Sequence, residues 1–406
     1  MKNYAYLLRA GALWTYVIAF MIGSIYAQVI PTLSLFLVDN FEANAFELGV
    51  FFVLFAASTI CVSQVIGVLS DRGLNRLHLA AAGLATGALG CVGFAYSPSY
   101  GFALVVAVFI FCFSGITLPQ VMAAGREHAD THFAPEQIPL YNSALRASFA
   151  LSWVAGPPLG FILQHQLGAK THYLALAVAH VVAILLVLTR LPKNAANSQR
   201  AKQSAQESDT PHEKPHIPLN LKIGFLACAI LFGMNQSYII ALPQLLREHL
   251  DISTHYTGFI MGTAAALEIP IMLLGGWLAA RAPLLPLIRL GALAASLLYL
   301  GVWLSSSLWH LIALQVFNAI FVGFIAGLGM TWFQDQMPKF AGTASSLFNN
   351  STNLGNVMGS IVVGTIAAWL GYHHMYGFNA VFTLVAVALL FLCKEGSVEA
   401  KDTKPA

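Results

Sequence analysis

The sequence predicts an all-α membrane protein in which twelve transmembrane helices form two six-helix bundles related by pseudo-symmetry. Three observations predict this fold class: the composition, the number of long apolar runs and an internal repeat. Of the 406 residues, 58% are apolar and only 9% are charged, and the mean hydropathy is +0.72. Such a composition excludes an ordinary soluble domain.

Apolar runs of about 18 residues or more, the length that crosses a bilayer, recur along the whole chain. The first run is too long for the core of a signal peptide and no small-residue cleavage site follows it, so we expect it to remain in the mature protein. The twelve predicted spans are 12–38, 46–70, 75–97, 99–125, 137–165, 171–191, 219–249, 253–281, 284–305, 308–335, 341–369 and 372–394.

One long polar segment, 192–218, divides the spans six and six. It mixes charges with serine, glutamine and proline and has no apolar periodicity, which predicts a flexible linker. With the N-terminus inside, 17 of the 20 Lys and Arg residues fall on the cytoplasmic side, the bias expected of membrane proteins. The predicted organisation is an N-terminal bundle (1–191), a cytoplasmic linker (192–218), a C-terminal bundle (219–394) and a cytoplasmic tail (395–406).

The two halves also repeat one another in sequence. Residues of the same type recur at an offset of 212 in spans one and seven, 209 in spans two and eight, 208 in spans four and ten, and 203 in spans five and eleven. Parallel repeats with a site where they meet are typical of alternating-access transporters. The repeated residues include Tyr26 and Tyr238, Pro31 and Pro243, Asp39 and Asp251, Arg72 and Arg281, and Gly156 and Gly359.

A single carboxylate, Glu268, lies in the middle of the eighth span, MGTAAALEIPIMLLGGWLAAR (261–281). A charge at this depth costs about 3 kcal/mol or more, so it normally faces a cavity or a partner. Pro270 follows and loosens the turn before it, which a membrane tolerates only where protein or a water-filled cavity shields the backbone. We expect Glu268 to be the centre of a solute pathway; the alternative is a carboxylate held by a neighbouring helix for packing alone.

Two motifs and several longer blocks carry a family resemblance. GVLSDRGLNR (67–76) is similar to the cytoplasmic signature of the major facilitator superfamily, although its second glycine is displaced. The run Gly156-Pro157-Pro158-Leu159-Gly160 resembles the antiporter-associated motif of that superfamily. Further blocks resemble the bacterial sugar efflux transporter family: PTLSLFL (31–37), LPQVMAAGREHAD (118–130), LSWVAGPPLGF (151–161), MGTAAALEIP (261–270) and GLGMTWFQDQMP (327–338). The resemblance implies proton-driven export of sugars across the bacterial inner membrane. The distribution of Lys and Arg predicts that both termini are cytoplasmic.

In this superfamily spans 1, 4, 7 and 10 line the central cavity, and spans 2, 5, 8 and 11 form the seam between the halves. Amides and tyrosine hydroxyls both donate and accept hydrogen bonds, as sugar hydroxyls do, and aromatic rings offer flat faces to a pyranose. The alternative for each residue is interhelical hydrogen bonding within the bundle. The predicted substrate-binding residues are Tyr26, Gln28, Gln120, Trp153, Asn235, Gln236, Tyr238, Gln315, Asn318, Trp332, Asn349 and Asn353.

Charged residues at the cytoplasmic ends of the spans are predicted to lock an inner gate, the part that the glycine–Asp–Arg signature plays in the superfamily. Solvated helix ends are the alternative. The predicted gate residues are Gly67, Asp71, Arg72, Arg76, Arg126, Glu127, Arg281 and Asp335.

Four further ionisable residues lie in or at the ends of spans. Arg146, in span five, is predicted to approach Glu268 and to control its charge during proton coupling, because spans five and eight are expected to be neighbours. We interpret His180, in span six, as a neutral packing residue, with a proton relay as the alternative. Asp39 and Asp251 end their helices at the outer surface, and we expect them to be solvated or to cap the helix.

The chain contains no motif that indicates an enzyme or an ATP-driven pump. There is no HExxH, GxSxG or P-loop, so we expect no enzyme and no direct use of ATP. The five cysteines have no paired spacing and predict neither a disulfide framework nor a metal site, and we expect no cofactor. The net charge of +3 reflects the basic cytoplasmic loops and gives no reason to expect nucleic acid. The predicted partners are a sugar, protons and the lipid bilayer, with the chain acting as a monomer; an amphiphile exporter and a non-transporting sugar sensor are the alternatives.

Overall fold

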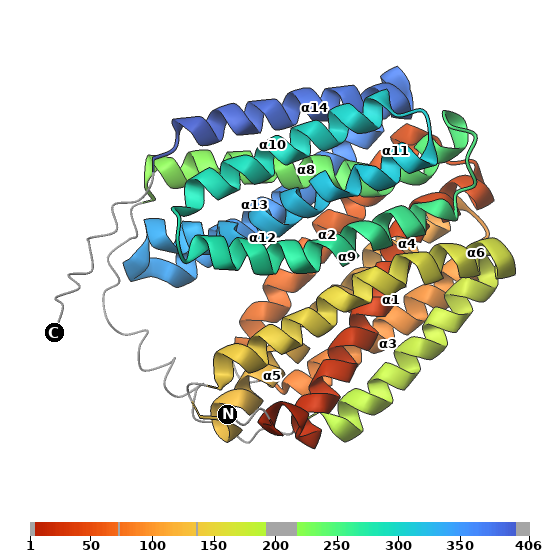
Figure 1. Cartoon of the computed structure of the whole chain (residues 1–406). Coiled ribbons are helices and arrows are strands. Elements are labelled where there is room, and N and C mark those ends of the chain that lie inside the picture. The colour runs from red at the N-terminus through yellow and green to blue at the C-terminus, as the bar shows by residue number, and fades with distance from the viewer. Residues whose placement is uncertain (1–4, 72–73, 135–136, 192–216, 395–406) are drawn as a thin grey trace. The chain divides into compact units, whose positions relative to one another are not determined.

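The computed structural model describes residues 5–71, 74–134, 137–191 and 217–394, which form helices and turns with no strand in these ranges. The predicted linker, up to residue 216, and the tail from residue 395 lie outside the described residues. The first half contains η1 (Ala5–Leu8), α1 (Ala10–Phe41), α2 (Ala45–Asp71), α3 (Arg76–Ala95), α4 (Tyr100–Phe109), η2 (Phe111–Ile116), α5 (Thr117–His132) and α6 (Ile138–Arg190) (Figure 1).

The second half is also helical throughout its described length. Its elements are α8 (Leu219–Glu248), α9 (Tyr256–Ala279), α10 (Leu284–Leu304), α11 (Leu308–Ala313), α12 (Gln315–Gln336), η3 (Pro338–Phe340), α13 (Ala341–Val362), a π-helical turn η4 (Val363–Ala367) and α14 (Ala368–Leu392).

Ten helical segments of the described chain are long and apolar enough to cross a membrane, and two of them contain two spans each. Helix α6 has 53 residues, about 80 Å of helix, which is more than twice the ~30 Å hydrocarbon core. It is interrupted at Gly168 (φ 77°, ψ 158°), and α14 is interrupted in the same way at Gly371 (φ 81°, ψ 161°). Only glycine enters this backbone region readily, so each glycine ends one span and begins the next. The prediction of twelve spans is confirmed.

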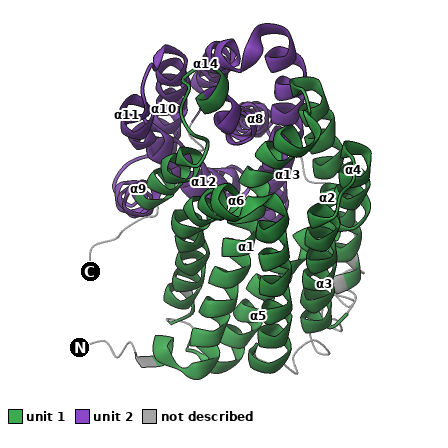
Figure 2. Cartoon of the chain, turned by 90° about the vertical axis from the view of Figure 1, so that its right-hand side faces the viewer, with its two compact units in different colours: residues 1–212, 246–266 green, residues 213–245, 267–406 purple. Residues whose placement is uncertain are grey.

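The chain forms two compact units (Figure 2). Unit 1 comprises residues 1–212 and 246–266, and unit 2 comprises residues 213–245 and 267–406. Helices α8 and α9 therefore each contribute one part to either unit. Within unit 1, α1 and α3 both pack along α6; within unit 2, α10 packs along α12 and α14.

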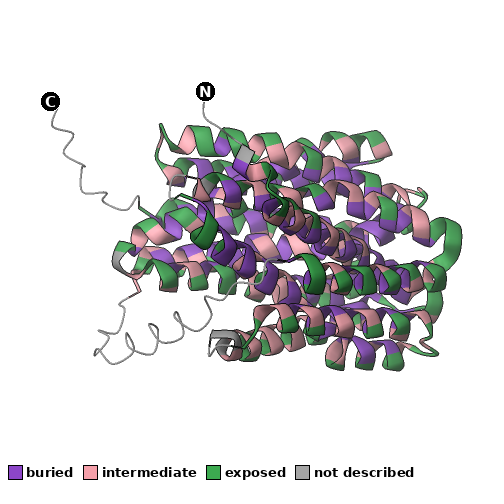
Figure 3. Ribbon diagram, turned by 90° about the horizontal axis from the view of Figure 1, so that it is seen from below, coloured by how far each residue is buried: buried purple, intermediate pink, exposed green. Residues whose placement is uncertain are grey.

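The helices show the burial expected of membrane spans, with buried faces turned toward neighbouring helices and apolar residues on the exposed faces (Figure 3). The second half of α6 is an example, since Val178, Val181 and Leu185 are exposed while His180 is buried. Exposed apolar side chains in such numbers are compatible with lipid contact rather than with water.

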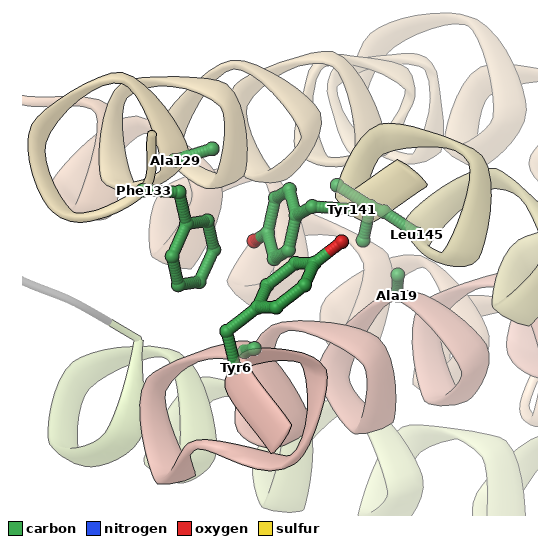
Figure 4. Close-up of a cluster of buried hydrophobic side chains, with 7 residues drawn as sticks. Tyr6, Ala19, Ala129, Phe133, Tyr141 and Leu145 are labelled. Carbon is green, nitrogen blue, oxygen red and sulfur yellow. The ribbon is translucent and has the colours of Figure 1, made fainter. Parts of the chain in front are cut away.

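An aromatic cluster closes one end of unit 1 (Figure 4). Tyr6 precedes α1, Phe133 follows α5 and Tyr141 lies in the first turn of α6, so the cluster joins three segments that are distant in sequence. Phe133 contacts both tyrosine rings, at centroid distances of 5.5 Å and 5.2 Å. Aromatic packing of this kind adds to the stabilisation from buried area.

Candidate transport site

A mostly buried ion pair in unit 1 joins α3 and α5. Arg76, the first residue of α3, donates from Nε to Glu127 Oε1 at 2.8 Å and from Nη1 to Gln120 Oε1 at 3.4 Å. The side chains of Arg76 and Glu127 are only 22% and 10% exposed, so solvent screens this ion pair weakly. Two predicted gate residues thus lie together, and Gln120, predicted to bind sugar, contacts Arg76.

Two other predicted gate residues have different partners in the described structure. Arg126 pairs with Asp130 one turn further along α5, at 2.9 Å. Arg281 donates to the carbonyl of Trp277 and lies 4.0 Å from the centroid of its ring. Gly67 is half-buried and Asp335 is exposed, while the side chain of Asp71 and all of Arg72 lie outside the described residues.

Three of the predicted substrate-binding residues of unit 1 lie on α1 and α6. The Tyr26 hydroxyl donates to the carbonyl of Ser114, which joins α1 to η2. Gln28 donates from Nε2 to the carbonyl of Ser24 on its own helix at 3.1 Å, so its amide oxygen is left for another partner. Trp153 of α6 is half-buried.

The predicted antiporter motif lies in the middle of the first span of α6, where α1 and α9 both approach it. A Cβ on Gly156 would meet Ala27 Cβ at 2.5 Å, and one on Gly160 would lie 3.1 Å from Gln28 Cα. Because the two glycines have no side chain, α1 and α6 can approach closely. Pro157 and Pro158 lie inside the helix, where a proline leaves a carbonyl one turn earlier without its donor.

In unit 2, Gln315 is the centre of a buried polar group. Tyr238 of α8 donates to Gln315 Oε1 at 3.3 Å, and Asn318, one turn along α12, donates to the same oxygen at 2.9 Å. Gln315 Nε2 donates in turn to the carbonyl of Leu311 at 2.6 Å. The structure thus brings together three predicted substrate-binding residues, all of them buried, and Asn318 Oδ1 has no partner among the described residues.

The remaining predicted residues of unit 2 differ in exposure. The Trp332 indole is 2% exposed and packs against Gly224 of α8, so no face of its ring is open to a sugar in this conformation. A Cβ on Gly359 of α13 would lie 2.8 Å from Gln236 Cβ, which shows how closely α8 and α13 pack. Asn235, Gln236 and Asn353 are half-buried and Asn349 is exposed.

Sequence reasoning missed the polar residues that extend this group toward α10 and α14. The rings of Tyr299 and Tyr376 both lie 6.2 Å from that of Tyr238, and both hydroxyls are buried without a partner among the described residues. Asn379 of α14 donates to Ser237 Oγ at 2.9 Å. The signal was present, since tyrosine and asparagine in apolar spans are uncommon, but these spans are not among those that the superfamily resemblance assigns to the cavity or to the seam.

Glu268 lies in the middle of α9, which continues as a helix through Pro270. Its side chain is half-buried, and the structure gives its carboxylate no hydrogen bond or ion pair with a described residue. Arg146 is exposed on α6. Because Arg146 belongs to unit 1 and Glu268 to unit 2, their pairing stays a prediction.

Two other expectations have different outcomes. His180 is fully buried, close to Gly87 of α3, and its Nδ1 lies 2.8 Å from the carbonyl of Leu176, the environment of a packing residue. Asp39 was expected to be solvated or to cap its helix; its side chain is 39% exposed, and it also forms an ion pair with Arg247 at 2.5 Å. This partner was not predicted because Arg247 is 208 residues away in sequence. Asp251 is exposed, with a left-handed φ of 51°.

A helical bundle of twelve apolar spans in two repeated halves, with polar groups buried inside each half, is the architecture of a polytopic membrane transporter rather than of an enzyme. The particular family follows from comparison with known proteins. Residues 12–281 and 224–406 match the Major Facilitator Superfamily, and the chain belongs to that family.

Similar proteins match the chain over nearly its full length. "Sugar efflux transporter A" of Dickeya chrysanthemi is 38% identical over 374 residues, 92% of this chain and 91% of that protein. "Sugar efflux transporter B" of Salmonella typhimurium is 33% identical over 379 residues, 93% of this chain and 94% of that protein. Among solved structures, a variant of the nucleoside transporter NupG has a TM-score of 0.78 at 13% identity, covering 95% of this chain and 100% of that chain, which shows a shared fold.

Proposed function

We propose that this chain exports sugars or sugar-like solutes across the inner membrane by proton antiport and alternating access. The observation that carries the proposal is the similarity, at 38% and 33% identity over more than nine tenths of each chain, to transporters named for sugar efflux. Identity at this level over the full length extends to the helices that would surround a solute, and not only to the fold.

The chemistry of the predicted binding residues supports a hydrophilic solute. Amide groups and tyrosine hydroxyls outnumber charges on the spans expected to line the cavity, and neutral groups of this kind hydrogen-bond to sugar hydroxyls. Gln28, Asn235 and Gln236 are half-buried, so their amides can reach a solute with little rearrangement. Tyr238 and Gln315 are buried and hydrogen-bonded to each other, and they are better suited to hold the binding helices in place.

Glu268 is the proposed proton-binding group. It is the one carboxylate in the middle of a described span, and no described residue neutralises it. Burial disfavours the charged form of a carboxylate, so such a group exchanges protons as its surroundings change. Arg146 is the proposed partner that favours the charged form in one of the two conformations. In this proposal both termini and the segment 192–218 face the cytoplasm, and a single chain transports.

The test is transport of radiolabelled sugars into inverted membrane vesicles that contain the chain, driven by an imposed pH gradient. Uptake is expected for at least one mono- or disaccharide, with none in vesicles that lack the chain. The matched variant is Asn353→Ala, which should lower the affinity for sugar while leaving the amount of protein unchanged. Sugar binding without uptake would indicate a sensor, and uptake of amphiphilic dyes alone would indicate drug efflux; either result would contradict the proposal.

A further inference from the structure

Two contacts in unit 1 join segments from opposite halves of the sequence at one end of the helices. The first is the ion pair between Asp39, near the end of α1, and Arg247, near the end of α8. The Arg247 Nη2 and Asp39 Oδ1 atoms are 2.5 Å apart, and the two side chains are 38% and 39% exposed. A half-exposed ion pair stabilises a conformation only slightly, which suits a contact that is broken and re-formed repeatedly.

The second contact is a pair of histidine rings. His165 is near the end of the first span of α6, and His255 directly precedes α9; their ring centroids are 5.3 Å apart and the rings are inclined by 38°. Ser253 Oγ is hydrogen-bonded to His255 Nδ1 at 2.7 Å, and the Tyr256 ring lies 4.1 Å from that of His255. The imidazole of His255 is therefore held beside that of His165.

Immediately after His255 in the sequence, the first turns of α9 pack against the proline motif of α6. A Cβ on Gly258 would lie 2.7 Å from Pro158 Cα, and one on Gly262 would lie 2.8 Å from Pro158 Cγ. Two glycines one turn apart thus let the start of α9 lie against α6 with no intervening side chain. The His165–His255 contact lies just before this closely packed stretch, at the start of α9. When α6 and α9 separate from this end, the two histidine rings part first.

We propose that Asp39, Arg247, His165 and His255 form a pH-sensitive outer latch, which holds together the helix ends on the side predicted to face outward and which protonation of His255 releases. The ion pair joins the predicted spans one and seven, and the histidines join spans five and eight. Both links must break for these ends to part. The latch rests on the proposed function in one respect only: a transporter needs one conformation in which these helix ends are together and another in which they are apart.

The sign of the pH dependence follows from the surroundings of His255. Burial, and secondly the positive charge that His165 can carry, lower the pKa of His255 while the rings are together. Separation restores an ordinary value near 6.5, so the separated state binds more protons and gains population as the pH falls below about 7. The other ionisable residues near these helix ends are Asp39 and Glu42 on α1, Lys170 on α6, and Arg247, Glu248, His249 and Asp251 along α8 and its connection to α9.

The experiment measures the distance between the two helix ends without any sugar. Spin labels at Asn40→Cys and Glu248→Cys report on α1 and α8; both positions are exposed, and Cys61→Ser removes the exposed native cysteine. Lowering the pH from about 7.5 to about 5.5 should raise the ratio of long to short distances by about twofold or more, since the separated state binds more protons. An unchanged distribution overturns the latch.

Variants separate the two parts of the proposal. His165→Gln/His255→Gln should abolish the pH response, whereas His249→Gln, on the same connection, should retain it. Asp39→Asn should raise the long-distance population at both pH values, and the charge-exchanged pair Asp39→Arg/Arg247→Asp should restore the short distance. A pH response that survives in the double histidine variant overturns the assignment. Because no sugar is present, failure of the proposed transport activity would leave this result unaffected.

Discussion

The N-terminal repeat (12–191) and the C-terminal repeat (219–394) depart from regular helix at matching places. Gly168 and Gly371, 203 residues apart, hold the same left-handed conformation between two spans. Ser99 and Ser307, 208 residues apart, both accept a hydrogen bond from the first turn of a short helix. The offsets are those at which the sequence repeats. The backbone pattern was therefore retained in both repeats.

The polar interiors of the two repeats differ in kind. The N-terminal repeat has a weakly exposed ion pair between Arg76 and Glu127 at the ends of its helices. The C-terminal repeat has the neutral group around Gln315, and its carboxylate, Glu268, is in the middle of a span. An ion pair at a helix end suits a gate, and an unpaired mid-span carboxylate suits proton exchange. In the proposed function, the ion pair of the N-terminal repeat would serve the inner gate and Glu268 of the C-terminal repeat would exchange protons.

Replacing the mid-span carboxylate should have the largest effect. Glu268→Gln keeps the shape of the side chain but cannot ionise, so pH-driven sugar uptake in proteoliposomes should fall to background while sugar exchange at equilibrium continues. Thr59 stands 209 residues earlier, at the matching place in α2, and donates only to its own helix at Phe55. Thr59→Val should leave uptake within about twofold of the unmodified protein. Uptake by Glu268→Gln at the unmodified rate would show that another group couples the proton.

Breaking the N-terminal ion pair should cost stability. Arg76→Gln leaves the Glu127 carboxylate mostly buried without its cation, and we expect a loss of about 2–3 kcal/mol in the free energy of unfolding. The double variant Arg76→Gln/Glu127→Gln should recover part of this loss. Lys222, an exposed residue in the first turns of α8, is the comparison: Lys222→Gln should change stability by about 0.5 kcal/mol or less. Denaturant titrations in mixed micelles measure all three, and equal effects of Arg76→Gln and Lys222→Gln would show that the ion pair contributes no more than an exposed charge.

The two glycine breaks should respond alike. Gly168→Ala and Gly371→Ala meet open space, so only the left-handed backbone opposes the methyl group, at about 1–2 kcal/mol each. Gly101→Ala and Gly276→Ala, also open but in regular helix, should be neutral or slightly stabilising. Denaturant titrations in mixed micelles measure the free energy of unfolding of all four glycine variants. A large effect at one break and none at the other would mean that the repeats do not share this turn.

The sequence predicted the spans and the repeat because a bilayer demands long apolar helices and because the repeated residues fix their pairing. It did not predict the interruption of the fourth span, where α4 ends at Phe109 and a 3₁₀ turn, Phe111–Ile116, precedes α5. That stretch is mostly apolar and contains no proline, and its single Ser114-Gly115 pair is too weak a turn signal to mark the break against the hydropathy.

Individual polar partners were harder still to predict from the sequence. Gln120 was grouped with the sugar-binding residues, and the structure places its amide beside Arg76. Asp39 was expected to be solvated or to cap its helix, and its partner comes from the other half of the chain. Which group a helical side chain meets depends on the rotation and height of each helix against its neighbours, and packing of all the helices decides both.

The smallest expected effect is at the paired serine caps. Ser99 Oγ accepts from Phe102 N at 3.3 Å and Ser307 Oγ from His310 N at 3.4 Å, so each bond is long, and alanine should cost only about 0.5–1 kcal/mol. The loss should nevertheless be visible locally, because α4 has 10 residues and α11 only 6. Hydrogen exchange of the first-turn amides should speed up in Ser99→Ala and Ser307→Ala. Ser306→Ala, one residue before the second cap, should leave exchange unchanged; equal acceleration there would mean that the cap hydroxyl is not what protects these amides.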